Sequence, residues 1–231
     1  MLSSAAGDVN SEEMKDRALA ALPNERSGVT SAAGPQLAIS MIGSPAQSIL
    51  RPSQLEAQAF QRDLQQKTLF GEPSIFSTDH GIQASVQDHY LTLSQNGSSL
   101  RIGEDGSIRL ILKLPSMRHG LAAIIQEDVE ERISTGLQFS LQLIDSFDPT
   151  ERLSHLAAAV ALLNTSYSGW RTRREHQESP NSMTITHGFE EQHARVTLSP
   201  PHRTRAAFRN QLADISTDLT TLLRRMMRGR G

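Results

Sequence analysis

The arginine-rich stretch around the single tryptophan is the strongest candidate for chemistry in this sequence. Residues 168–185 read SGWRTRREHQESPNSMTI, and a second group of arginines starts at position 203. The candidate binding residues are Trp170, Arg171, Arg173, Arg174, Arg203, Arg205 and Arg209. A guanidinium beside an indole suits an anionic or planar group, through bidentate hydrogen bonds and stacking. In the alternative interpretation Trp170 fills the core, and the arginines face solvent or pair with acids such as Glu175.

Histidines supply a second, different chemistry. His187 and His193 flank the turn GFEEQ, so they would face each other across paired strands at about 5 Å. With His176 and Glu175 nearby in sequence, they predict a two-histidine, one-carboxylate metal site and hence a metal-dependent hydrolase. Histidines exposed near a hairpin explain the same pattern, so this enzyme is the alternative interpretation, and no catalytic residue, metal or cofactor is assigned.

A run of acids, Glu127, Asp128, Glu130 and Glu131, precedes most of a long apolar-periodic segment. On a helix, residues three and four apart share a face. Carboxylate chemistry would need a second element and a concave site. We therefore interpret the run as the solvated face of a helix.

The sequence excludes several common classes of site. It contains no phosphate-binding loop, no dinucleotide fingerprint, no serine-hydrolase elbow and no HExxH motif. It also has no cysteine, which rules out disulfides, thiolate nucleophiles and cysteine-based zinc sites. The absence of an apolar segment of membrane-spanning length, and of a leader-like N-terminus, predicts a cytoplasmic protein without a membrane partner.

Charge divides unevenly along the chain. Residues 171–231 hold 11 arginines and 6 acids, a net charge of +5, whereas residues 1–170 hold 12 basic and 19 acidic residues, a net charge of −7. Such a dipolar surface suits electrostatic docking on a protein partner or on a second copy, and the basic end suits a nucleic-acid backbone.

The N-terminal half alternates between helix and strand signals. Residues 10–22 predict a short helix capped by Asn10 or Ser11, residues 24–34 a linker, and QLAISMI a strand. A capping-box pattern at Ser53 and Glu56 predicts a helix over about 54–67. Residues 82–114 alternate in short runs broken by Asp88-His89, Asn96-Gly97 and Asp105-Gly106, which predicts an antiparallel meander.

The C-terminal half contains longer elements. Apolar residues recur every three or four positions over 120–147, which predicts one long amphipathic helix. The run LSHLAAAVALLN fits a helix or a buried strand, and we favour the strand. SMTITH and HARVTLS predict a second hairpin, which Pro200-Pro201 separates from a final helix over roughly 203–227.

Together these elements predict an α+β fold with a mostly antiparallel sheet or sheets, packed with three or four helices of which two are long and amphipathic. Residues 1–34 would be a short helix and linker, 35–118 one α+β subdomain and 119–231 a second. Alternatively, the long helix packs across both parts.

Three segments carry a family resemblance: DPTERLSHLAAAVALLN, GWRTRREHQESPNSM and LSPPHR. They resemble the C-terminal region of bacterial Schlafen/AlbA-like proteins, known as ATP-binding proteins, over roughly residues 35–228. Nothing here corresponds to the nucleotide-binding domain that precedes this region in the family. The resemblance therefore implies an accessory region. We predict a non-enzymatic interaction or regulatory module of a nucleotide- or nucleic-acid-linked bacterial system, which docks through a basic C-terminal surface and an acidic helix.

Overall fold

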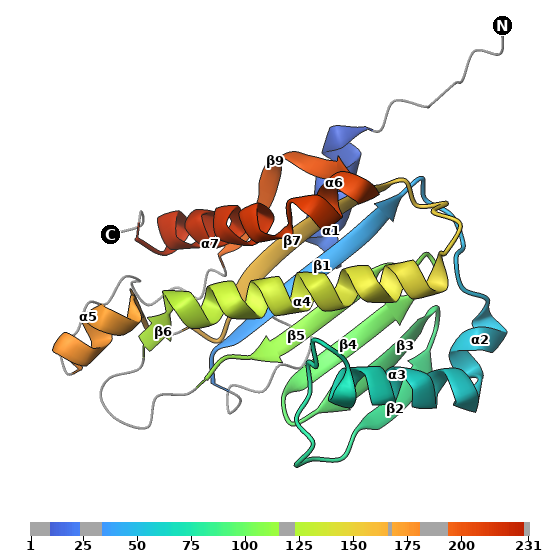
Figure 1. Cartoon of the computed structure of the whole chain (residues 1–231), viewed down its shortest axis with the longest axis horizontal. Helices are drawn as coiled ribbons and strands as arrows, with labels where there is room; N and C mark the ends of the chain where they lie inside the picture. The colour runs from blue at the N-terminus through green and yellow to red at the C-terminus, as the bar shows by residue number, and fades with distance from the viewer. Residues whose placement is uncertain (1–9, 24–33, 116–122, 166–167, 181–193, 229–231) are drawn as a thin grey trace, which may run out of the picture.

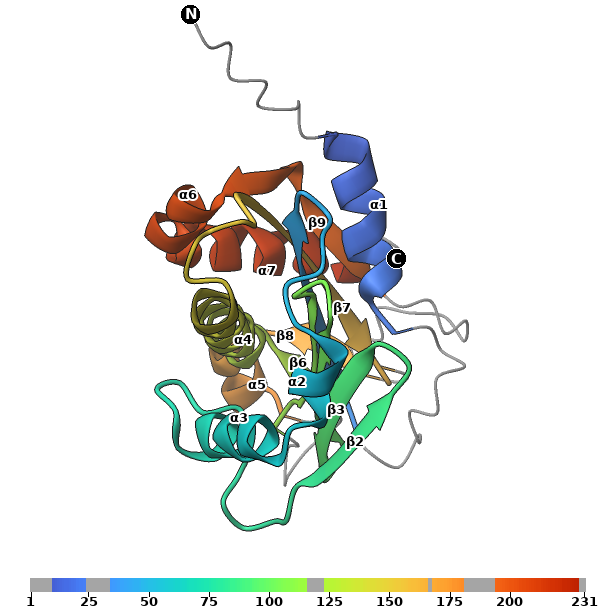
Figure 2. The same cartoon turned by 90° about the vertical axis from the view of Figure 1, so that its right-hand side faces the viewer.

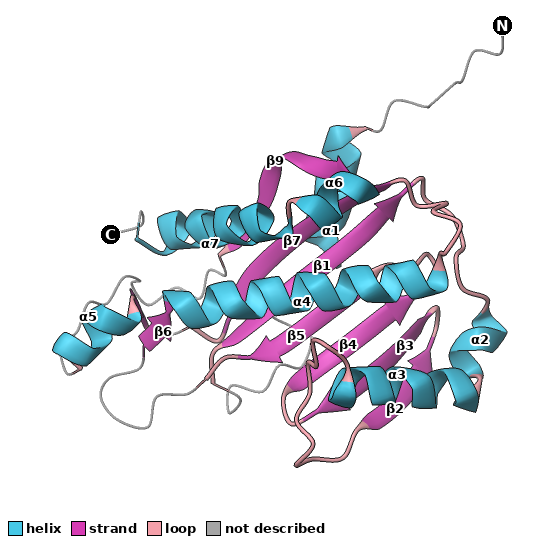
Figure 3. Cartoon of the chain, viewed as in Figure 1, coloured by secondary structure: helices cyan, strands magenta, loops and turns pink. Residues whose placement is uncertain are grey.

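Seven strands pair into one antiparallel sheet in the order β2-β3-β4-β5-β1-β7-β9 (Figures 1 and 3). The computed structural model describes residues 10–23, 34–115, 123–165, 168–180 and 194–228. The strands are β1 (Gln36–Ser44), β2 (Gln83–Gln87), β3 (Tyr90–Gln95), β4 (Ser98–Gly103), β5 (Ile108–Lys113), β7 (His155–Leu163) and β9 (Arg195–Thr204). The predicted α+β, mostly antiparallel fold is confirmed.

Helices cover the two faces of the sheet unequally. Figure 2 shows α1 (Ser11–Ala21) on one side of the sheet, and α3 (Gln58–Phe70), α4 (Gln126–Phe147) and α7 (Leu212–Arg228) on the other. The shorter elements are α2 (Pro52–Glu56), α5 (Arg173–Glu178), α6 (Arg205–Asn210) and a two-stranded parallel sheet of β6 (Ala123–Ile125) and β8 (Gly169–Arg171). No helix among the described residues is long and apolar enough to cross a membrane.

The meander β2–β5 has the predicted turns. Asn96 and Gly97 have positive φ values of 43° and 82°, as a two-residue hairpin turn requires, and Gly106 has φ of 75° in the next turn. Strand alternation then places residues such as Leu91 and Leu93 in the core. Their neighbours Tyr90 and Thr92 therefore lie on the opposite face.

Strand β1 joins the two halves of the chain. It pairs with β5 on one side, where Gln36 lies opposite Lys113, and with β7 on the other, where Gln36 lies opposite Leu163. One apolar cluster contains side chains from both halves, and α4 packs along the sheet they share. The predicted subdomains 35–118 and 119–231 thus contribute strands to one shared sheet, and α4 contacts both β1 and β5.

Strand β7 explains the ambiguous run LSHLAAAVALLN. Helix α1 covers one of its faces, where Met14 and Ala18 pack against Ala157 and Ala159, and the main core covers the other. A strand buried on both faces has no polar alternation, so its sequence reads as an unbroken apolar run. The small alanine side chains also leave room for α1 to pack closely on the strand.

Several boundaries differ from the predictions. The expected helix 54–67 is divided at Ala57 into α2 and α3, and residues 123–125 form β6 instead of the start of the long helix. Strand β9 continues through Pro200 and Pro201, although proline has no backbone N–H to donate. These residues fit because β9 is an edge strand and its pairing with β7 shifts register between Ala157 and Ala159. The final helix is correspondingly divided into α6 and α7. The first strand of the predicted second hairpin lies outside the described residues.

Candidate binding surface

Trp170 and Arg171 are buried in β8, at the end of the molecule where α4 begins. Trp170 is 2% exposed, and its Nε1 donates a hydrogen bond to Gln126 Oε1 at 3.3 Å. Arg171 is 6% exposed, and its Nη1 donates to the carbonyl of Ser179 at 2.7 Å. Both side chains therefore hold α5 and β8 against α4, and their contacts agree with the structural interpretation of the tryptophan motif.

Arg173 and Arg174 begin α5 and pair with acids. Arg173 Nη2 lies 2.6 Å from Asp128 Oδ1, and this hydrogen bond raises the pKa of the guanidinium. The backbone N–H of Arg173 donates to Glu127 Oε2 at 2.9 Å. Arg174 pairs with Glu178 one turn further along α5. Two acids of the run on α4, Glu127 and Asp128, thus bind Arg173, where we predicted a solvated face.

Arg205 and Arg209 form a second group at the opposite end of α4. Arg205 is 2% exposed and contacts Asp145 at 2.7 Å and the fully buried Asp148 at 3.0 Å. Arg209 contacts the same Asp145 at 2.7 Å and Glu151 at 2.9 Å. These ion pairs fix α6 on the C-terminal end of α4.

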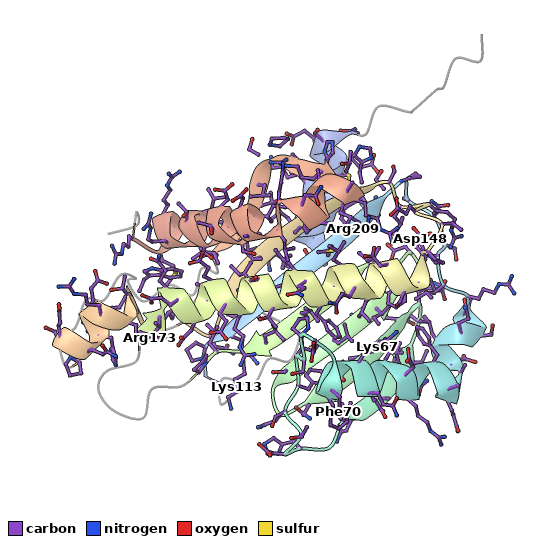
Figure 4. The ribbon with its side chains drawn as sticks, viewed as in Figure 1. Lys67, Phe70, Lys113, Asp148, Arg173 and Arg209 are labelled. Carbon is purple, nitrogen blue, oxygen red and sulfur yellow. The ribbon has the colours of Figure 1, made fainter. Side chains whose placement is uncertain are left out.

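The seven sequence-predicted residues do not form one surface. Figure 4 labels Arg173 near the N-terminal end of α4, and Asp148 and Arg209 near its C-terminal end. A helix of the 22 residues in α4 is about 33 Å long. Arg203 lies with the second group and donates to the carbonyls of Pro200 and His202 at 2.7 and 2.9 Å. The described arginines of the expected basic C-terminal surface are thus divided between the two ends of α4, and Arg173, Arg205 and Arg209 are paired with acids of that helix.

The carboxylates beside Arg205 have lowered pKa values. Burial raises the pKa of Asp145, but hydrogen bonds from Arg209 and Arg205 outweigh it and lower the pKa. For Asp148, burial is likewise outweighed by hydrogen bonds from the backbone N–H groups of Leu153 and Arg152 and from the Arg152 side chain. Both carboxylates are therefore ionised in the folded protein at neutral pH.

Acid should destabilise the protein through this cluster. A carboxylate whose pKa is lower folded than unfolded stabilises the fold above its unfolded pKa, and this stability is lost as the pH falls through the folded value. We expect the free energy of unfolding, measured by urea titration, to fall as the pH drops below about 4. Asp145→Asn removes one carboxylate and should flatten this dependence. An equally steep loss in the variant would contradict the assignment.

The predicted metal site is only partly visible. His187 and His193 lie outside the described residues. His176 is 9% exposed on α5, and its Nδ1 has no hydrogen-bond partner among the described residues. Nowhere in the described part of the chain do three His, Asp or Glu side chains lie close enough together to hold a metal ion.

A different basic surface lies on the part of the sheet that α1 does not cover. We call it the open face: the surface of β2–β5 that points away from α3 and α4. Its side chains are Gln83, Ser85, Gln87, Tyr90, Thr92, Ser94, Ser99, Arg101, Arg109, Ile111 and Lys113. The helix α1 borders this face, where the Ser40 hydroxyl of β1 donates to the carbonyl of Ala18 at 2.6 Å. Three of these side chains are cationic and none is a carboxylate. Asp105, in the turn between β4 and β5, borders the face beside Gly103 and lies 3.9 Å from Arg17 of α1.

Arg101 and Arg109 form the centre of the open face. They lie directly opposite each other on β4 and β5. Arg101 Cζ lies 3.9 Å, and Arg109 Cζ 5.0 Å, from the centroid of the Tyr90 ring, and Arg109 Nη2 donates to the Tyr90 hydroxyl at 3.2 Å. Gly103, opposite Tyr90, makes room for the ring, since a Cβ there would lie 3.1 Å from Tyr90 Cε1.

These two guanidinium groups are not neutralised within the described structure. Neither forms an ion pair with a described carboxylate, and the Nε atom of each is buried without a hydrogen-bond partner among the described residues. Like charges on directly opposite strand positions destabilise a sheet, and a buried donor without a partner costs about 1–3 kcal/mol. The contacts with Tyr90 offset part of this cost, but the pair lacks the neutralising carboxylates that stabilise Arg205.

No family model, curated protein or solved structure matches this chain.

Sequence reasoning overlooked the open face because its arginines are separated by ordinary strand residues. One signal was present: Arg101 and Arg109 are spaced symmetrically about Asp105, in the turn between two alternating runs. In the structure Ile102 lies opposite Ile108, so positions equally distant from Asp105 are paired. A two-residue turn over Asp105 and Gly106 would instead place Arg101 opposite Leu110, so this signal alone did not fix the register.

Proposed function

We propose that this protein is a non-enzymatic recognition module that binds an acidic segment of a protein partner on the open face of its sheet. The observation that carries the proposal is the Arg101–Arg109 pair, which lies on this face without a described carboxylate to neutralise it. Such a pair lowers the stability of the sheet in the free protein, and an anionic ligand relieves that repulsion.

The composition of the open face supports an extended acidic ligand. Lys113 adds a third positive charge on β5, and most of the remaining side chains are Ser, Thr or Gln. Hydroxyl and amide groups donate hydrogen bonds to carboxylates and backbone carbonyls alike. A partner segment with several Asp or Glu side chains therefore finds both charge complementarity and donors along its length.

A protein segment fits this face better than single-stranded nucleic acid. Sheets that bind single strands stack the bases on exposed aromatic rings. Tyr90 is the one aromatic residue on the open face, and the guanidinium groups of Arg101 and Arg109 already occupy its ring. Base stacking has no comparable platform among the described residues of this face.

This proposal keeps part of what the sequence predicts and moves the docking surface. An interaction or regulatory module of a nucleotide- or nucleic-acid-linked bacterial system, cytoplasmic and related to the Schlafen/AlbA-like accessory region, remains the proposed setting. The basic surface that docks the partner is the open face, since Arg173, Arg205 and Arg209 are paired with acids.

A glutamate homopolymer labelled with a fluorophore tests the proposal by anisotropy. We expect Arg101→Gln combined with Arg109→Gln to weaken its binding about tenfold or more, since each lost charge-assisted hydrogen bond contributes about 1.5 kcal/mol or more. The matched control is Arg62→Gln, which removes an exposed arginine of α3 on the other side of the sheet. The double variant should keep its thermal stability, because losing the repulsion between the two charges offsets losing their contacts with Tyr90.

Two results would contradict the proposal. One is equal affinity of the native protein, the double variant and the Arg62→Gln control for the glutamate polymer. The other is that oligothymidine binds more tightly than the glutamate polymer. If that affinity also decreased steeply with salt and were lost in the double variant, the open face would be assigned to nucleic acid.

A further inference from the structure

We infer that the centre of the open face is a site for a phosphate monoester, held between Arg101 and Arg109. This inference rests on the proposed function: the phosphate monoester is a chemical group on the acidic partner segment that the open face binds. The partner would then be an acidic segment that is phosphorylated on a side chain.

The charge of the arginine pair matches a phosphate monoester. Arg101 and Arg109 carry two positive charges on directly opposite positions of neighbouring strands. A phosphate monoester carries a charge of about −1.5 to −2 at pH 7, whereas one carboxylate carries −1. One phosphate therefore neutralises both guanidinium groups, whereas one carboxylate leaves a net positive charge between them.

The donors are also arranged in one row. Directly opposite positions across β2, β3, β4 and β5 are Ser85, Thr92, Arg101 and Arg109. Directly opposite positions of antiparallel strands point to the same face, so Thr92 lies beside Arg101 on the open face and places a hydroxyl near the arginine pair. A phosphate has three terminal oxygens, and two guanidinium forks and a hydroxyl can satisfy all of them.

Tyr90 holds the pair in place before a ligand arrives. Its ring lies against Arg101 at 3.9 Å, and its hydroxyl accepts one of the five N–H donors of Arg109. Both guanidinium planes are therefore oriented by the same residue. A pre-oriented pair loses less side-chain entropy on binding than two free arginines would.

Three acidic peptides of one sequence test this inference by calorimetry. They differ at one central position, which is serine, phosphoserine or glutamate. We expect the phosphoserine peptide to bind the native protein about tenfold more tightly than the glutamate peptide, because bidentate pairs to a dianion are stronger than single charge-assisted bonds. Arg101→Lys combined with Arg109→Lys keeps both charges but removes the planar forks. This variant should lose the preference for phosphoserine and still bind the glutamate peptide.

The pH dependence supplies an independent readout. The second pKa of a phosphate monoester is about 6, and arginine stays protonated throughout, so only the phosphoserine peptide should bind more weakly as the pH falls from 7.5 to about 5.5. Inorganic phosphate should compete only weakly, because it lacks the acidic segment.

Equal affinities for the phosphoserine and glutamate peptides would overturn the phosphate inference and leave the proposed function intact. Inorganic phosphate that binds as tightly as the phosphoserine peptide would also overturn it, since the ligand would then be a free anion. No binding of any of the three peptides would overturn both proposals.

Discussion

Arg205→Ala should lower the free energy of unfolding by about 3–5 kcal/mol, because it leaves a buried carboxylate without its charged partner. Asp148 is fully buried, and Arg205 Nη1 donates to its Oδ2 at 3.0 Å. The backbone N–H of Leu153 and Nε of Arg152 also donate to Asp148, but Arg152 is partly exposed to solvent. Arg205 is thus the buried cation that compensates this carboxylate, and it also anchors α6 on α4.

Urea unfolding at pH 7 measures this effect, with Arg174→Ala as the matched control. Arg174 forms an exposed ion pair within α5, with 86% of its side chain accessible, and such pairs contribute about 0.5 kcal/mol or less. Adding Asp148→Asn to Arg205→Met removes both buried charges and should recover part of the stability. A loss below about 1 kcal/mol for Arg205→Ala would mean that the ion pair adds little to the fold.

Trp170→Ala should destabilise the protein by about 3–5 kcal/mol, as expected when a buried tryptophan is truncated to alanine. The indole is 2% exposed and belongs to the main apolar cluster with Val129 and Leu223. Trp170→Phe keeps most of the apolar contact and loses the hydrogen bond to Gln126, so it should cost less, about 1–2 kcal/mol.

Two measurements on Trp170→Ala and Trp170→Phe separate the two interpretations of the tryptophan motif. They are the free energy of unfolding and the affinity for the glutamate polymer. The structural interpretation predicts a large loss of stability for Trp170→Ala and an unchanged affinity for Trp170→Phe. If Trp170→Ala folded as stably as the native protein but no longer bound the polymer, the arginine–tryptophan motif would be a recognition site after all.

Local sequence patterns predicted the elements of this fold well. The turns at Asn96-Gly97 and Asp105-Gly106 were identifiable because a tight hairpin requires residues that accept positive φ. Strand β7 was identifiable as a short apolar run bounded by polar residues. The periodicity of Val129, Ile133 and Leu137 placed the buried side of α4 correctly.

Long-range pairing limited the prediction of both the sheet and the site. Nothing local to β1 indicates that it pairs with both β5 and β7, which lie in different halves of the chain. The partners of Arg173 and Arg205 are acids 45 and 57 residues away, so the neutralisation of these arginines depends on how α4 packs. The open face is likewise defined by the extent of α1, which contacts β1, β7 and β9, reaches Ile111 of β5 and leaves the rest of β2–β5 uncovered in the described structure.

An NMR titration of the arginine side chains tests the central claim most directly. The Nε–Hε resonances of Arg101 and Arg109 report on donors that have no hydrogen-bond partner among the described residues. On addition of the glutamate polymer, we expect these two resonances and the backbone amides of β3–β5 to shift, while those of Arg173, Arg205 and Arg209 stay in place. Shifts confined to the ends of α4, with Arg101 and Arg109 unchanged, would contradict the account.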